Sequence, residues 1–423
     1  MDRRSHWERR ARSHRDSQSA ASPNERGNES RLIPTDAVAL RVGGRPRSAL
    51  SACALGAASA LLAACGPATV HFDPATAQRI TVRPASGAAD FCPGERFQVE
   101  VLAGTADGHT CSNIDAARGC LGKKDALIDP EMVRIQASSG APAGDMEDFL
   151  WMPSPNVLDT ADTGMVLRAW LEKMIEGQAH RSPVAETRLR PNYTCQRARA
   201  FSFPPARQGE SGGRGPDLQI AITHLRTPFY PDAALLRITS DEEVVYAISP
   251  TDSQPIHIIS RGQPGGKGEP GERGRDGRAG TAGKACGDGG DGQPGGDGAP
   301  GGPGGSGGRG GSILVVYDSS GGERLLGRVL PESVGGAPGA GGSGGLGGDG
   351  GEGGAAGPTD ARCVTKAGSR GVNGGHGEDG FVGAPGRAGP PPILRAAPRD
   401  ALFAQEMDAI SRIEAAADRK IAK

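Results

Sequence analysis

Glycine occupies every third position through most of the second half of this chain, and no other feature restricts its fold more. Counting in threes gives four blocks of eight in-frame glycines, at 262–283, 289–310, 336–357 and 368–389. Because glycine has no Cβ, each block carries a bare ridge along which another backbone can approach closely. The step after Gly283 falls on Cys286 and interrupts the count.

The first block contains GKGEPGERGRDG (266–277), which closely resembles the collagen-like repeats of bacterial surface proteins. A collagen triple helix needs imino acids above about 15–20% of residues, whereas residues 262–310 hold five prolines in 49. The four matched blocks favour extended three-fold rods lying side by side, similar to the polyglycine-II bundles of some glycine-rich secreted proteins. A collagen-like triple helix and disorder remain the alternatives.

Additional glycines predict the neighbours of each rod. The second block has an extra glycine in six triplets and the third block in five, which leaves a second bare ridge on these two rods. We therefore expect rods 289–310 and 336–357 to be interior and the other two to be edges. If the rods alternate in direction and each spans about 70 Å, at ~3.1 Å per residue, Cys286 and Cys363 lie in turns at the same far end. This arrangement predicts a Cys286–Cys363 disulfide.

The clearest targeting signal lies at 42–65. Arg45 and Arg47 precede an apolar stretch, and Leu62-Ala63-Ala64-Cys65 closes it. The tetrapeptide resembles a bacterial lipobox, which implies a signal peptide at 42–64 and lipidation of Cys65 as the mature N-terminus. Gly66 in place of aspartate favours the outer membrane by the same resemblance. Residues 1–41 are interpreted as a disordered or mis-called extension, and 65–75 as a tether.

Residues 76–260 contain short apolar runs of period two separated by Pro, Gly, Asp and Ser, which predict antiparallel strands. The predicted fold class is a mostly β, sandwich-like N-terminal module followed by a glycine-rich polyproline-II/polyglycine-II helical bundle at 262–389. Within the module, the spacing of Val166, Trp170 and Met174 predicts one helix over 162–176. An apolar run at 313–317 predicts a buried strand, and an apolar stripe predicts a C-terminal helix over 396–422.

Six of the eight cysteines remain after Cys53 of the signal peptide and Cys65 are set aside. Four of them precede the glycine blocks and permit three pairings. The short gap between Cys111 and Cys120 suits a local loop, and Cys92 and Cys195 each lie beside a strand pattern. We therefore expect Cys111–Cys120 and Cys92–Cys195, and an oxidising compartment outside the cytoplasm.

The sequence contains no recognisable catalytic motif, so no catalytic residue is assigned. His109, Cys111 and Cys120 lack a fourth ligand at a zinc-finger spacing. The glycine blocks carry acidic residues in a pattern similar to that of calcium-binding glycine repeats, namely Asp288, Asp291, Asp297, Asp349 and Glu352. They lack the apolar residue after the aspartate that those repeats need to form a β-roll. No metal and no cofactor are expected, and a net charge of −1 disfavours nucleic-acid binding.

Three functions remain open. The first is a lipid-anchored structural or interaction protein of the cell envelope that displays a stiff glycine-rich domain. The second is a surface binding module, with a glycan or protein ligand on the β-domain and the repeats as a spacer. The third is an extracytoplasmic enzyme. We favour the first, as a monomer with a trimer as the alternative, and a deep polar pocket in the β-domain would favour the others.

Overall fold

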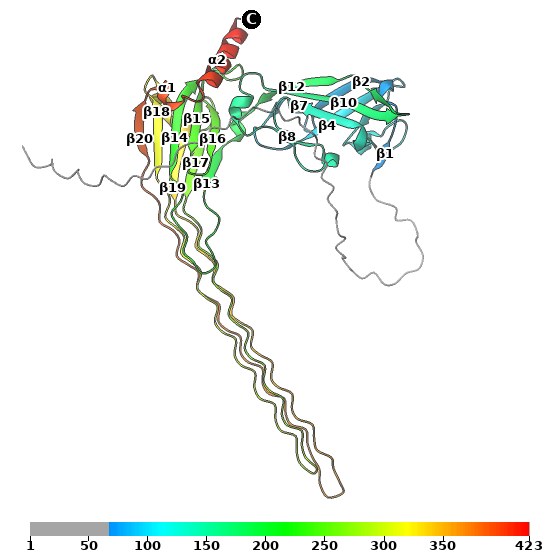
Figure 1. Cartoon of the computed structure of the whole chain (residues 1–423), viewed down its shortest axis with the longest axis vertical. Helices are drawn as coiled ribbons and strands as arrows, with labels where there is room; N and C mark the ends of the chain where they lie inside the picture. Colours follow the sequence, from blue (N-terminus) through cyan, green and yellow to red (C-terminus); the bar gives the residue numbers. More distant parts are fainter. Residues whose placement is uncertain (1–66, 423) are drawn as a thin grey trace, which may run out of the picture. The chain divides into compact units, whose positions relative to one another are not determined.

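The structure is a computed structural model that describes residues 67–422, and these form mostly β-strands in several sheets with few helices (Figure 1). The expected extension 1–41, the signal peptide 42–64 and Cys65 lie outside the described residues. Within 67–422, no helix has the length and apolar character needed to span a membrane.

Two mainly antiparallel sheets form the N-terminal module. The first sheet contains β2 (Ala77–Pro84), β4 (Phe97–Thr105), β5 (Thr110–Ser112), β8 (Ala141–Pro142) and β9 (Leu150–Met152). The second contains β3 (Asp90–Phe91), β7 (Val133–Ala137), β10 (Met165–Ile175), β11 (Gln178–Arg181) and β12 (Ala185–Pro191). Alternate residues of β4 and β10, such as Val99, Val101 and Leu167, are fully buried in one shared core. The apolar face of each sheet is thus covered by the other.

Residues at the start of this module form regular structure where a tether was expected. Strand β1 (Ala68–Val70) pairs in parallel with β6 (Ala126–Ile128), and the 3-10 helix η1 (Pro74–Thr76) follows. The prediction of a tether over 65–75 is therefore wrong from Ala68 onward. The other 3-10 helices are η2 (Ala116–Arg118), η3 (Pro130–Met132), η4 (Met146–Asp148), η5 (Val157–Asp159), η6 (Tyr193–Cys195) and η7 (Gly322–Arg328).

The predicted helix over 162–176 is also wrong, because these residues form strand β10. Leu167 and Leu171 lie four apart and fit a helical stripe, but they also fit a strand of period two, together with the fully buried Met165 and Ala169. The neighbouring strands select the extended conformation, because β10 is hydrogen-bonded to β7 on one side and to β12 on the other. Local periodicity did not reveal those partners.

A second sandwich is built from strands on both sides of the glycine blocks. One sheet has the parallel strands β13 (Ala198–Phe201), β17 (Ile256–Arg261) and β19 (Val329–Val334). The other has β14 (Leu218–Leu225), β15 (Ala233–Thr239), β16 (Val244–Pro250), β18 (Ile313–Asp318) and β20 (Ile393–Ala397). Ile258 of the first sheet and Ile220 and Val315 of the second share a buried core. The apolar run predicted as a buried strand is β18.

The C-terminal residues cover the outer face of the larger sheet. The predicted helix over 396–422 is in fact β20, α1 (Arg399–Leu402) and α2 (Met407–Ile421), separated near Phe403. Phe403 is fully buried beside Arg237, whose guanidinium donates to both carboxylate oxygens of Glu406 at 3.2 and 3.3 Å. Tyr246 donates to the same carboxylate, so the buried negative charge of Glu406 has two partners.

The predicted fold class is wrong. The glycine blocks form neither helix nor strand, and no collagen-like or polyproline helical bundle follows the β-module as a separate unit. Each block instead continues a strand of the second sandwich: β17 leads into 262, 310 leads into β18, β19 leads into 336, and 389 leads into β20. The β-structure therefore does not end at 260, because β18 and β19 lie between the glycine blocks and β20 follows the last of them.

Candidate functional site

The four glycine blocks, here called glycine segments 1 to 4 in chain order, lie side by side and bond to one another through the backbone (Figure 1). Segments 1 and 2 are antiparallel, as shown by Gly290 N donating to Thr281 O and Gly305 N to Gly266 O, each at 2.8 Å. Bonds of 2.8 to 2.9 Å at every third residue likewise join segments 2 and 3, and segments 3 and 4, in antiparallel order. The backbone groups that have no partner within an extended segment thus find one in its neighbour.

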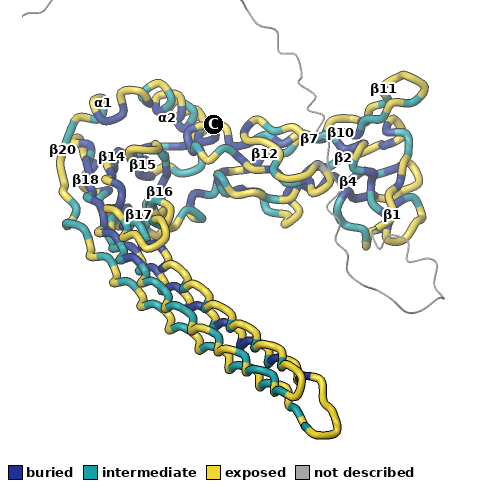
Figure 2. Tube along the Cα trace, turned by 60° about the horizontal axis from the view of Figure 1, so that its bottom comes forward, coloured by how far each residue is buried: buried dark blue, intermediate teal, exposed yellow. Residues whose placement is uncertain are grey.

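Segments 2 and 3 are the interior members. Each has backbone bonds to the other three segments, whereas in the described chain no backbone bond joins segments 1 and 4. A Cβ at Gly295 of segment 2 would overlap the carbonyl oxygen of Gly348, and a Cβ at Gly348 would overlap that of Arg275. Glycine is therefore required where two backbones meet, and residues with long side chains, such as Glu272 and Arg275, are exposed. Figure 2 shows how buried and exposed positions alternate along the segments.

Each glycine segment keeps the parallel neighbour of the strand that it continues. Segments 1 and 3 are parallel neighbours like β17 and β19, and segments 2 and 4 are parallel neighbours like β18 and β20. Sheets of a sandwich stand about 10 Å apart because side chains fill the space between them. Once glycine replaces those side chains, the two layers come close enough to hydrogen-bond directly.

Aspartates on segment 2 bond to segment 4. Asp291 Oδ1 accepts from Ser369 N and Asp297 Oδ1 accepts from Gly375 N, both at 2.6 Å. These carboxylates were singled out in the sequence for their similarity to calcium-binding repeats. Their geometry gives them a different role, since they satisfy backbone N–H groups at positions where the neighbouring segment offers no carbonyl.

The loop 202–217, between β13 and β14, folds back on itself as a short hairpin that the sequence analysis missed. It covers segments 1 and 2 at their end next to the sandwich. Gly209 N donates to Lys267 O at 2.8 Å, and Gly212 N donates to Ser306 O at 2.7 Å. A Cβ at Gly266 or at Gly305 would overlap this hairpin. The glycine-rich run SGGRG at 211–215 was the available signal, but it is too short to show a triplet count.

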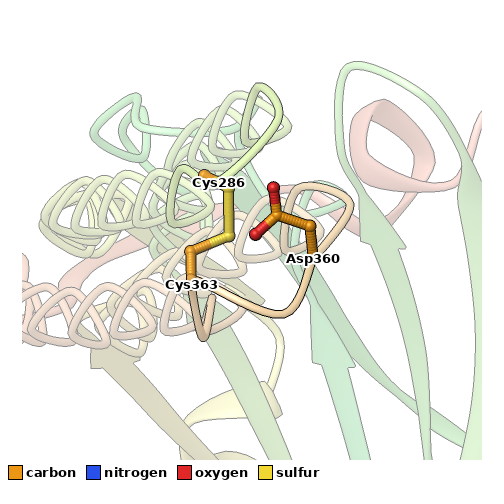
Figure 3. Close-up of side chains that lie close together, drawn as sticks. All are labelled: Cys286, Asp360 and Cys363. Atoms are coloured by element: carbon orange, nitrogen blue, oxygen red, sulfur yellow. A yellow bond between two sulfur atoms is a disulfide. The ribbon is translucent and has the colours of Figure 1, made fainter.

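A disulfide joins the two distal turns of the segments (Figure 3). Cys286, in the turn after segment 1, is bonded to Cys363, in the turn after segment 3, with their Cα atoms 5.5 Å apart. Asp360 lies beside the two sulfur atoms, all three ligand-type atoms being within 4.8 Å of one another. The sulfurs are bonded to each other and offer no thiolate to a metal ion. The group is therefore a cross-link between two hairpins, at the end farthest from the sandwich along the chain.

The other two disulfides lie in the N-terminal module and join the pairs expected from the sequence. Cys92–Cys195 links residues 103 apart, and Cys111–Cys120 closes a local loop. Three disulfides in one chain indicate an oxidising compartment, so the protein is secreted or belongs to the cell envelope.

His109, which the sequence analysis weighed as a metal ligand, belongs to no metal-ligand group among the described residues, and neither do His180 and His224. His180 pairs with Asp73 at 3.0 Å, and His224 with Asp232 at 2.9 Å. His109 lies 3.8 Å from a carboxylate oxygen of Asp107, outside hydrogen-bond distance. Each of these three histidines has a different carboxylate as its neighbour, which is the usual setting of a surface histidine in a stable fold.

An open groove of about 650 Å³ lies on the N-terminal module and is lined in part by His71, Arg134 and Met174. The volume suits a small ligand. However, His71 is already paired with Asp129 at 2.7 Å, and Met174 is exposed. The lining also includes Glu131, Glu172 and Lys173, so the groove is polar, and the His71–Asp129 and Glu172–Arg181 ion pairs already occupy part of it.

Comparison with known proteins found no match for this chain among family models, curated proteins or solved structures.

Proposed function

We propose that the protein is a lipid-anchored structural or interaction protein of the cell envelope that displays the glycine segments away from the membrane. The observation that carries this proposal is the bonding of the four glycine segments to one another. Their inner positions are glycine, their outer positions carry mixed polar and charged side chains, and a disulfide joins their distal turns. Such an array has no interior that could hold a substrate, and its extended backbone suits the spanning of distance.

The membrane part of the proposal rests on the sequence at 45–66. The basic and apolar order that ends in Leu62-Ala63-Ala64-Cys65 resembles a bacterial lipobox, and Gly66 favours the outer membrane. The disulfides of the mature chain agree with an export route. We propose that the protein is a monomer, because the disulfide and the backbone hydrogen bonds of the segments are all made within one chain. It assigns no catalytic residue, no cofactor and no nucleic-acid partner.

The alternative, a surface binding module with the glycine segments as a spacer, would rest on the groove beside His71. We favour the structural role because the core between the two sheets of that module is filled by side chains such as Val99 and Leu171, which are fully buried. The hollow lies outside that core and is open, and part of its polar lining is already paired, His71 with Asp129 and Glu172 with Arg181.

Replacing Cys65 with alanine tests the proposal. We expect this variant to lose labelling by a radioactive or alkyne fatty acid and to leave the membrane fraction. The matched control is Cys53→Ala, which changes a cysteine of the same signal peptide and should keep both the label and the membrane association. A Cys65→Ala protein that stays with the membrane as well as the control does would refute the lipid anchor.

A further inference from the structure

Strand β1 begins only three residues after Cys65. Ala68 N donates to Asp125 O at 3.1 Å, and β1 then pairs with β6 through Val70. Three residues of fully extended chain span at most about 11 Å. If Cys65 carries the lipid, as proposed above, the backbone at Asp125 is held near the surface of the bilayer, with no long tether to move it away.

The residues just before Asp125 form a rigid turn. Cys120 and Lys123 exchange two backbone hydrogen bonds of 2.9 Å, and the disulfide from Cys111 fixes Cys120 from the other side. Gly119 has a φ of 67°, and a Cβ there would lie 2.6 Å from the carbonyl oxygen of Lys123. These contacts hold the turn in a form that leaves Lys123 and Lys124 exposed.

Lys123 and Lys124 are exposed cations beside the start of β1. Neither takes part in an ion pair within residues 67–422, whereas the nearby Arg118 is bound to Asp115 at 2.8 Å. Asp125 is the one carboxylate in the turn, so the turn keeps a net positive charge. An open hollow of about 340 Å³ lies beside the lysines and gives a headgroup access to them.

We propose that Lys123 and Lys124 bind the phosphates of anionic phospholipids in the membrane that holds Cys65. This inference rests on the proposed lipid anchor. The short distance along the chain matters because electrostatic attraction to a charged surface decays over about 10 Å at 0.1 M salt. A lysine near an anionic membrane contributes about 1 kcal/mol, which corresponds to about a five-fold preference for the bound state.

Amine reactivity tests this contact in the full-length lipidated protein. The protein is placed in vesicles of phosphatidylethanolamine and phosphatidylglycerol and briefly acetylated, and peptides are then analysed by mass spectrometry. We expect Lys123 and Lys124 to react about five-fold more slowly than Lys284 and Lys366, which are exposed lysines of the distal turns. Vesicles of phosphatidylcholine alone should give less protection.

A variant with twelve Gly/Ser residues inserted after Gly66 is the matched control. A flexible linker of that length has an end-to-end distance of about 20 Å, so Lys123 and Lys124 should then react as fast as Lys284 and Lys366. Equal reactivity of all four lysines in the parent protein, with acyl chains found on the Cys65 peptide, overturns this inference and leaves the lipid anchor in place. A Cys65 peptide without acyl chains overturns both.

Discussion

A single added methyl group at Gly348 should open the glycine segments locally. Gly348 lies in segment 3, donates to Gly296 O and accepts from Gly374 N, each at 2.9 Å. In Gly348→Ala, the Cβ would overlap the carbonyl oxygen of Arg275 in segment 1. That carbonyl belongs to the backbone and has no side-chain torsion by which to move aside, so segments 1 and 3 must separate there.

The free energy lost in Gly348→Ala can be judged from the backbone hydrogen bonds that hold segments 1 and 3 together at this position. Gly274 N to Leu346 O and Gly277 N to Asp349 O, both 2.8 Å, flank the overlap. Each such bond contributes about 0.5–1.5 kcal/mol net, so losing two weakens the contact by about 1–3 kcal/mol. Since 1.4 kcal/mol is a factor of ten, amide hydrogen exchange in peptides around 271–278 should accelerate by about 5- to 150-fold.

The matched control is Gly375→Ala in segment 4. Gly375 is exposed, and the atom nearest to its added Cβ would be the flexible Asp297 carboxylate oxygen at 3.2 Å. We expect a change of less than about 0.5 kcal/mol, as for an ordinary surface substitution. Exchange measured by mass spectrometry on both variants decides the matter. If Gly348→Ala exchanges no faster than the control, the close approach of the two backbones does not explain the glycine spacing.

Two further substitutions probe the distal disulfide and the C-terminal segment. Cys286→Ser removes a cross-link between residues 77 apart in the chain, and the loss of this loop closure destabilises the fold by up to about 4–5 kcal/mol. Amide hydrogen exchange should therefore rise in the turns 284–288 and 358–367 but not in β14. Unchanged exchange in the turns would contradict the cross-linking role. Burial, followed by the Glu406 carboxylate, raises the pKa of Tyr246 to about 12 from its usual 10.0. The folded state therefore holds this proton more tightly than the unfolded state, and the stability contributed by Tyr246 is complete below pH 10 and is lost as the pH rises toward 12. Tyr246→Phe should reduce the fall in the urea unfolding midpoint over this window, and an equal fall in both proteins would count against the buried contact.

The amino-acid sequence by itself determined which residues could lie backbone to backbone. Glycine at every third position leaves a bare ridge, and the extra glycines of 289–310 and 336–357 leave a second one, so these two segments could have neighbours on more sides. The equal lengths of the blocks placed Cys286 and Cys363 at the same end, where the structure joins them. The loop between Cys111 and Cys120 was likewise short enough to identify from spacing.

Only the tertiary structure decided what the glycine segments belong to. The predicted helical bundle was wrong because the conformation and the layering of these segments are set by the strands that lead into them, and those strands pair across more than seventy residues of chain. Leu167 and Leu171 satisfy both a helical and a strand period, and β7 and β12 select the strand. In the same way, Ala68 became part of a sheet rather than a tether because Ala126 lies beside it. Pairing partners distant in the chain supply most of the hydrogen bonds of a sheet, and a local pattern contains no record of them.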